Sequence, residues 1–138
     1  MDIAQIPFNK FIEISHVAEN KDILILSFND NMKNHIGTFH ASAQFALAEA
    51  CSGLALQNTF PNLANSVVPV LRKAETKFKK PAQSKIIGKA IIYKEAASKF
   101  NLQIENKGRA SITVNVEIED ENGVITMAGT YDWFVQKI

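Results

Sequence analysis

The stretch that decides the fold is residues 41–57, ASAQFALAEACSGLALQ. It is rich in alanine and leucine and contains neither proline nor a β-branched residue, a composition that favours a helix. Its apolar residues stand on every side of the helix axis rather than in one stripe, which is typical of a helix enclosed by the rest of its protein. We therefore expect this segment to form a central buried helix.

Segments with β-strand character lie on both sides of this helix. Before it, residues 11–17 are short and β-prone, and residues 23–28 (ILILSF) form a near-continuous apolar run. After it, strands are expected within residues 67–78, 85–94, 109–120 and 124–137. Apolar residues alternate from Ala110 to Ile118, so one face of that strand is buried. The turn at residues 120–123 (DENG) predicts a hairpin between the last two strands.

Residues 94–107 fit two patterns. Alternation through Phe100 and Ile104 suits a strand, but the same two residues also repeat with Ala96 at helical spacing, and Gly108 follows. We favour a short second helix that ends near this glycine. The order of elements predicts an α+β fold in which an antiparallel sheet of five to six strands curls around one long helix.

Length and composition limit the classes of protein to consider. The 138 residues suit a single domain over residues 1–138, and 46% apolar with 21% charged residues is typical of a globular protein. The net charge of +1 gives no general attraction to nucleic acid or to an anionic membrane. A lone cysteine excludes an internal disulfide, and the N-terminal residues lack the pattern of a secretion signal. These features together predict a cytoplasmic protein.

Glu49 is the most informative single residue. It is the only ionisable side chain between His40 and Arg72, and it stands in the middle of the expected buried helix. An unpaired carboxylate in such a place costs several kcal/mol or changes its pKa. The alternative is a structural ion pair, with a lysine from outside the helix or at a subunit interface.

The helix positions that share a face with Glu49 are small or polar. They are Ser42, Ala46, and Ser52 or Gly53, at spacings of three and four residues. A narrow cleft along this face is therefore expected.

Asn34, His40 and the backbone of residues 37–42 lead into the N-terminus of this helix. Free N–H groups and the helix dipole favour negative charge there, so we expect an oxyanion site. For His40 taken alone, capping of the helix is the more frequent role. Cys51 lies about 200° around the helix from Glu49, and we interpret it as a packed thiol rather than a nucleophile. The basic residues near Arg72 suit either a phosphate-bearing ligand or a solvated strand face.

Residues 34–53 (NHIGTFHASAQFALAEACSG) resemble the active-site segment of hotdog-fold acyl-CoA thioesterases of the phenylacetic-acid-degradation (PaaI-like) type. Their pattern is Asn, then Gly and His, then two small residues, with Leu-Ala-Asp or Leu-Ala-Glu ending nine residues after the His. Asn34, Gly37, His40 and Glu49 fall on those positions. Residues 77–82 (KFKKPA) and the expected closing hairpin extend the resemblance over nearly the whole chain.

The resemblance implies a hotdog fold and hydrolysis of an acyl thioester, with acyl-CoA or another acyl thioester as the substrate. It implies Glu49 as general base or nucleophile, the N–H of Ala41 as oxyanion donor, and Asn34 as the group that orients the carbonyl or water. It also implies a homodimer in which Glu49 faces the His40 loop of the partner, and it leaves open whether two dimers pair into a homotetramer. No cofactor and no metal are expected. The substrate-binding positions expected are Gly37, Ser42, Phe45, Ser52, Arg72 and Lys73.

The sequence departs from the family in three places. Ala41 and Ser42 replace the usual glycine pair, Glu49 is one methylene longer than aspartate, and Leu71 stands where relatives often have a hydroxyl. The main alternative is therefore a non-catalytic acyl-CoA or fatty-acyl binding protein on the same fold. An acyl-thioester dehydratase comes third, because the chain lacks the His-Phe-Pro signature of those enzymes. Apolar residues such as Phe45 suggest a medium-chain or aromatic acyl group.

Overall fold

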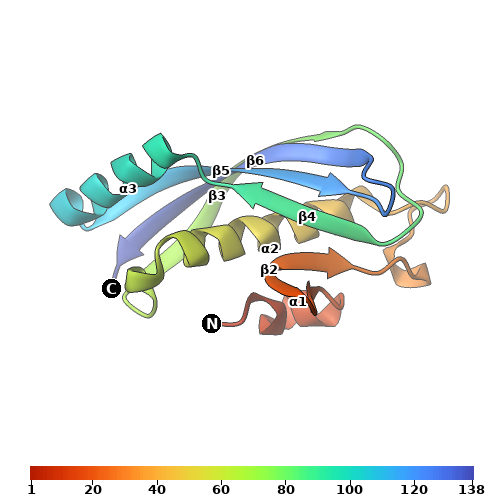
Figure 1. Cartoon of the computed structure of the whole chain (residues 1–138), viewed down its shortest axis with the longest axis horizontal. Coiled ribbons are helices and arrows are strands. Elements are labelled where there is room, and N and C mark those ends of the chain that lie inside the picture. The colour runs from red at the N-terminus through yellow and green to blue at the C-terminus, as the bar shows by residue number, and fades with distance from the viewer.

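The computed structural model describes residues 1–138 and consists of one antiparallel sheet wrapped around a long helix (Figure 1). The six strands follow the order β1-β2-β4-β5-β6-β3, and every neighbouring pair is antiparallel. Their bounds are β1 Ser15–Val17, β2 Asn20–Leu26, β3 Val67–Phe78, β4 Ile86–Ile91, β5 Arg109–Glu119 and β6 Ile125–Lys137. The predicted α+β hotdog architecture is confirmed.

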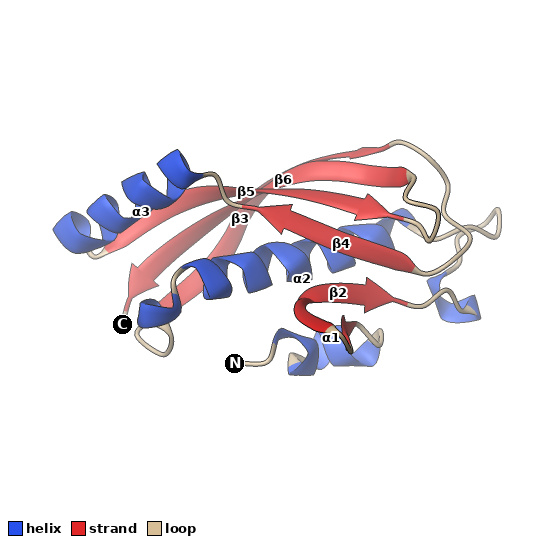
Figure 2. Cartoon of the chain, viewed as in Figure 1, coloured by secondary structure: helices blue, strands red, loops and turns tan.

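The central helix α2 spans Ala41–Thr59 and lies along the concave face of the sheet (Figure 2). It packs mainly against β2, β4 and β5, and also contacts β6. The residues of β5 that alternate from Ala110 to Ile118 face it and are buried, as predicted. Leu47 and Ala48 on the helix are fully buried, because the sheet and the N-terminal segment cover opposite sides of it. The central buried helix is confirmed and is two residues longer than expected. No helix of the chain is long and apolar enough to cross a bilayer.

The second helix, α3, spans Lys94–Lys107 and confirms the helical interpretation of that segment. It lies beside the first half of β5, where β4 has already ended at Ile91. The helix ends because Gly108 adopts a φ of +70°, a conformation that glycine takes at little cost, and donates its N–H to the carbonyl of Ile104. The predicted hairpin is also confirmed, with Asp120 accepting hydrogen bonds from two N–H groups of the turn.

The N-terminal segment differs from the prediction. Residues 11–17 are a strand only over Ser15–Val17, while the 3₁₀ helix η1 (Ile3–Gln5) and the helix α1 (Pro7–Phe11) precede it. Proline at the first helical position favours α1, and Glu13 at a φ of +67° redirects the chain before β1. Two further 3₁₀ turns, η2 (Asp30–Met32) and η3 (Pro61–Leu63), flank α2 in the sequence.

Strand β3 is an edge of the sheet and pairs only with β6. It is 12 residues long, so its free side presents a long row of backbone groups without a partner strand in this chain. Val68 and Val70 are about half exposed, at 51% and 50%. A long exposed apolar edge is the feature of a sheet that most readily pairs with another chain.

Candidate active site

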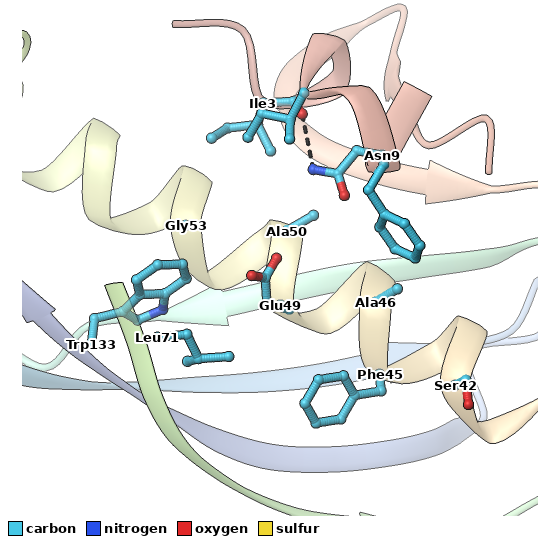
Figure 3. Close-up of a pocket in the computed structure, with 12 residues that line it drawn as sticks. Ile3, Asn9, Ser42, Phe45, Ala46, Glu49, Ala50, Gly53, Leu71 and Trp133 are labelled. Atoms are coloured by element: carbon cyan, nitrogen blue, oxygen red, sulfur yellow. Dashed lines mark hydrogen bonds between the residues drawn. The ribbon is translucent and has the colours of Figure 1, made fainter. Parts of the chain in front are cut away.

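Glu49 projects from the middle of α2 into a cavity of about 410 Å³. Figure 3 shows its carboxylate among apolar side chains, with Trp133 and Leu71 on one side and Phe45 towards the N-terminal end of the helix. The walls come from α2, from the N-terminal segment, and from β3 and β6. The other lining residues are Ile3, Ile6, Phe8, Asn9, Ser42, Ala46, Ala50 and Gly53.

The Glu49 carboxylate has no charged partner. It is the only ionisable side chain in the lining, and it takes part in none of the ion pairs or side-chain hydrogen bonds of the chain. Burial raises the pKa of this carboxyl above its ordinary value. An ion pair with a lysine of the same chain, one form of the structural alternative, is therefore excluded. A partly buried carboxylate with a raised pKa in a cleft is a frequent mark of a functional site.

The face predicted to form a cleft does form one. Ser42, Ala46, Glu49 and Gly53 all line the cavity, and Phe45 joins them. Of the substrate-binding residues predicted from the sequence, Ser42 and Phe45 thus lie in the same cavity as Glu49.

Ser52 lies outside this cavity. Its hydroxyl donates to the carbonyl of Glu49 at 2.7 Å and accepts the indole N–H of Trp133 at 2.8 Å. The side chain is fully buried, so both hydrogen bonds are protected from water. Ser52 therefore positions the Trp133 ring against α2 rather than contacting a ligand in the cavity.

The N-terminal segment forms a wall of the cavity that the sequence analysis missed. Ile3, Ile6 and Phe8 face α2, and the buried Asn9 amide donates to the carbonyl of Ile3 at 3.0 Å. The spacing of Ile3 and Ile6 before Pro7 could have indicated a short helical segment with an apolar side.

The N-terminus of α2 has the features of an oxyanion site. His40 caps the helix, because its Nδ1 atom accepts the N–H of Ser42 at 3.0 Å, and its ring is exposed. The N–H of Ala41 has no acceptor within the chain. In this structure His40 is therefore the N-cap of α2, which is the more frequent role of a histidine at such a position.

Asn34 braces the loop before this helix. Its side-chain oxygen accepts the N–H groups of Ile36 and Thr38, and its amide donates to the Thr38 hydroxyl at 2.8 Å. Gly37 takes a φ of +79° inside the same turn and is exposed. Asn34 and Ala41 both border a small hollow of about 220 Å³ that also includes Lys79 and Lys80.

Glu49 and the helix N-terminus are far apart within one chain. Ala41 precedes Glu49 by eight positions, which is about 12 Å along the helix axis. Within one chain, Glu49 and Ala41 therefore line different cavities.

Arg72 and Lys73 lie away from Glu49. They border a hollow of about 470 Å³ with Lys99 of α3 and the outward-facing residues of β5 and β6. The Arg72 guanidinium lies 5.2 Å from the centre of the Phe134 ring. Leu71, the residue before Arg72 in the strand, lines the Glu49 cavity instead. The register of β3 shifts between Leu71 and Lys73, and the contact of Arg72 with Phe134 places it on the other face of the sheet.

Cys51 is buried in the core, and burial raises the pKa of its thiol to about 12. Its sulfur fills the space over Gly88 in β4, where a Cβ atom would overlap with it. The Cys51 thiol therefore fills space in the core, as predicted from the sequence.

The chain belongs to the family described as "Domain of unknown function (DUF4442)", whose profile matches residues 7–135. No curated protein matches the sequence.

Similar solved structures show the same hotdog fold. A probable thioesterase from Pseudomonas aeruginosa is 19% identical with a TM-score of 0.81, covering 99% of this chain and 91% of its own. A thioesterase from Haemophilus influenzae is 16% identical with a TM-score of 0.74, covering 98% and 86%. A Bacillus halodurans protein in a structure with CoA is 17% identical with a TM-score of 0.70, covering 93% and 74%.

Proposed function

We propose that this protein hydrolyses an acyl thioester, with acyl-CoA as the substrate and Glu49 as the central catalytic group. The observation that carries the proposal is an unpaired, partly buried carboxylate in an apolar cavity on the central helix. A raised pKa makes the Glu49 carboxylate a stronger proton acceptor, because a catalytic base works best when its pKa lies near the operating pH. The two named thioesterases and the CoA complex among the similar structures support the same reaction class.

The reaction needs few groups. Glu49 accepts a proton from water while the water oxygen attacks the thioester carbonyl carbon, or its carboxylate attacks that carbon directly and water then releases the acyl group. The carbonyl oxygen becomes negative and requires hydrogen-bond donors. The C–S bond then breaks, and the thiolate takes up the proton, giving free acid and thiol. Because a thiol has a pKa of about 8.5, the leaving group departs without a strong acid.

The oxyanion donor comes from a second copy of the chain. Within one chain, the N–H of Ala41 lies about 12 Å from Glu49 along the helix, which is too far for both to act on one carbonyl. The free edge of β3 offers a place for a second copy to pair. Leu71 of β3 lines the Glu49 cavity, so a strand added at this edge arrives beside it.

The symmetry of such a dimer suits a shared site. Two identical strands that pair in antiparallel fashion are related by a twofold axis perpendicular to the sheet. Both copies of α2 then lie on the same face of the joined sheet and run in opposite directions. The N-terminus of one copy is thereby directed towards the middle of the other, with the loop that Asn34 braces beside it.

A second candidate function is binding of acyl-CoA without hydrolysis. It is favoured by the lining of the cavity, where Leu71 supplies no hydroxyl beside Glu49 and Ser42 is the only hydroxyl-bearing residue. This version predicts saturable binding of acyl-CoA and no release of thiol.

The test is thiol release from a panel of short, medium, long and aromatic acyl-CoAs by wild type and Glu49→Gln. We expect wild-type turnover and a loss of at least about 10³-fold in the variant, since removal of a catalytic base has this order of effect. Glu105→Gln, on the exposed side of α3, is the matched control and should retain wild-type turnover. Saturable binding by both wild type and Glu49→Gln without thiol release would reject hydrolysis in favour of the binding function.

A further inference from the structure

A second apolar cavity lies next to the Glu49 cavity, towards the C-terminal end of α2. Its volume is about 420 Å³, and it shares Ile3, Ile6, Gly53 and Trp133 with the first. Figure 3 shows Gly53 and Trp133 on the side of Glu49 away from Ser42, where the two cavities meet. Each cavity alone has the volume of a small-molecule site.

The lining of the second cavity selects for hydrocarbon. It contains no ionisable side chain and is built mainly from Leu56, Phe60, Leu63, Val67, Phe100 and Val135. The rings of Phe60 and Phe100 lie 4.3 Å apart between centres and close its far end. The phosphates of CoA would find no cationic side chain here, so the occupant is the acyl part of a thioester.

Gly53 sits at the junction between the cavities. A Cβ atom at this position would lie 3.6 Å and 3.8 Å from the Trp133 ring and 3.9 Å from the end of Ile3. A methyl group would therefore fit, but a larger side chain would fill the space between these walls. The Trp133 ring cannot easily retreat, because its indole N–H is held by Ser52 at 2.8 Å.

The length of the path sets the length of the chain. Phe60 follows Glu49 by eleven positions, which is about 16 Å along the helix axis. One residue of an extended backbone contributes three bonds and spans roughly 3.3–3.6 Å. An extended alkyl chain therefore spans roughly 1.2 Å per bond. The path therefore accommodates about 13 bonds. An aromatic acyl group would occupy only the first cavity.

We propose that the acyl group of the substrate is a straight alkyl chain of about twelve to fourteen carbons that passes Gly53 and ends between Phe60 and Phe100. This proposal rests on the proposed thioesterase function and names its substrate class. Gly53 then lets the chain pass into the second cavity, and Phe60 and Phe100 limit its length.

The first measurement is thiol release from saturated acyl-CoAs of increasing length, from roughly four to eighteen carbons. We expect kcat/KM to rise by up to roughly fourfold per methylene, the effect of burying one methylene, and to reach its maximum near twelve to fourteen carbons. A profile that is flat, or that falls beyond the shortest chains, would overturn the proposal.

Two variants test the path itself. Gly53→Leu should lower the ratio of long-chain to short-chain kcat/KM by more than about tenfold, and Gly53→Ala by less, since a methyl group fits. Ala64→Trp fills the far cavity from an exposed position and should shorten the preferred chain by several carbons. Asn62→Trp adds the same ring outside the cavity and is its matched control. An unchanged ratio in folded Gly53→Leu, or an unchanged optimum in Ala64→Trp, would contradict the path.

Binding separates failure of this proposal from failure of hydrolysis. Displacement of a fluorescent polyene fatty acid by saturated fatty acids is measured in wild type, Glu49→Gln and Gly53→Leu. If no acyl-CoA is hydrolysed, but affinity rises with chain length in wild type and Glu49→Gln and falls for long chains in Gly53→Leu, the acyl path stands and the thioesterase function fails. Affinity independent of chain length in all three proteins would reject the path.

Discussion

The middle of α2 and its N-terminus are opposite in character, although they belong to one continuous helix. The middle is enclosed by the sheet and the N-terminal segment, and it presents one carboxylate to an apolar cavity. The N-terminus is exposed, capped by His40, and presents a free N–H group at Ala41. One region has a carboxylate in a largely apolar cavity, and the other has a free N–H group with no carboxylate beside it.

This contrast explains why, under the proposed function, a single chain does not hold a complete site. Helix geometry fixes the axial rise between the backbones of Ala41 and Glu49 at about 12 Å. A second copy is the simplest source of the missing half, and the unpaired edge of β3 beside Leu71 is where the chain can accept it.

After the loss of turnover already expected for Glu49→Gln, the largest effect comes from removing the hydrogen-bond donor at the N-terminus of α2 alone. Ala41→Pro deletes one N–H at the first helical position, where proline is favoured, and His40 already has the extended backbone that proline requires before it. We expect kcat to fall by about 10²-fold with little change in stability, because one oxyanion donor is lost. The measurement is steady-state thiol release together with denaturant unfolding. Wild-type turnover in Ala41→Pro would remove this N–H from the mechanism.

Mixed dimers sharpen the same comparison. A dimer of one Ala41→Pro chain and one Glu49→Gln chain contains one site with both groups intact if the site is shared between chains. Such a dimer, purified through two different tags, should show about half of the wild-type turnover. If both groups act within one chain, the mixed dimer stays as inactive as its parents.

The next largest effect is expected where β4 packs against the middle of α2. Gly88→Ala places a methyl group against the Cys51 sulfur and should lower the free energy of unfolding by about 2 kcal/mol. The double variant with Cys51→Ala should recover most of this loss, because the overlapping sulfur is then gone. Equal losses in the single and double variants, measured by urea unfolding, would show that the contact is not the cause.

A smaller effect is the cost of the Glu49 charge itself. Burial raises the pKa of Glu49 in the folded protein above its ordinary value of 4.5, so folding favours the protonated form. The stabilising contribution of the protonated Glu49 carboxyl is therefore fully present below pH 4.5 and is lost as pH rises through its folded-state pKa. Glu49→Gln should match wild type at low pH and exceed it by about 1 kcal/mol at neutral pH. A constant difference across this range, in unfolding experiments at several pH values, would contradict an uncompensated carboxylate.

The smallest effect is expected at the helix cap. His40→Ala removes the acceptor for the Ser42 N–H and should lower the free energy of unfolding by less than about 1 kcal/mol. Turnover should fall only a few-fold, because the ring positions the helix N-terminus rather than contacting the carbonyl. A loss of 10²-fold or more would instead assign His40 a direct part in catalysis.

The central helix, the β5–β6 hairpin and the position of an unpaired Glu49 carboxylate on a buried helix could all be predicted from the sequence. These features depend on local properties: helix propensity, alternation along a strand, and an ionisable residue on an otherwise apolar helix. The cleft face of Ser42, Ala46 and Glu49 also followed from spacing alone, since a helix fixes which residues share a side.

The residues that surround this face of α2 could be identified only from the tertiary structure. The N-terminal residues form a wall of the cavity through contacts with a distant part of the chain. Arg72 and Lys73 lie on the other face of the sheet, and the Ser52 hydroxyl holds the Trp133 ring through a hydrogen bond. Such contacts depend on which elements pack together, and no periodicity within one segment records them. The proposed acyl path past Gly53 could not be predicted from the sequence for the same reason, because its walls come from the two ends of the chain as well as from α2.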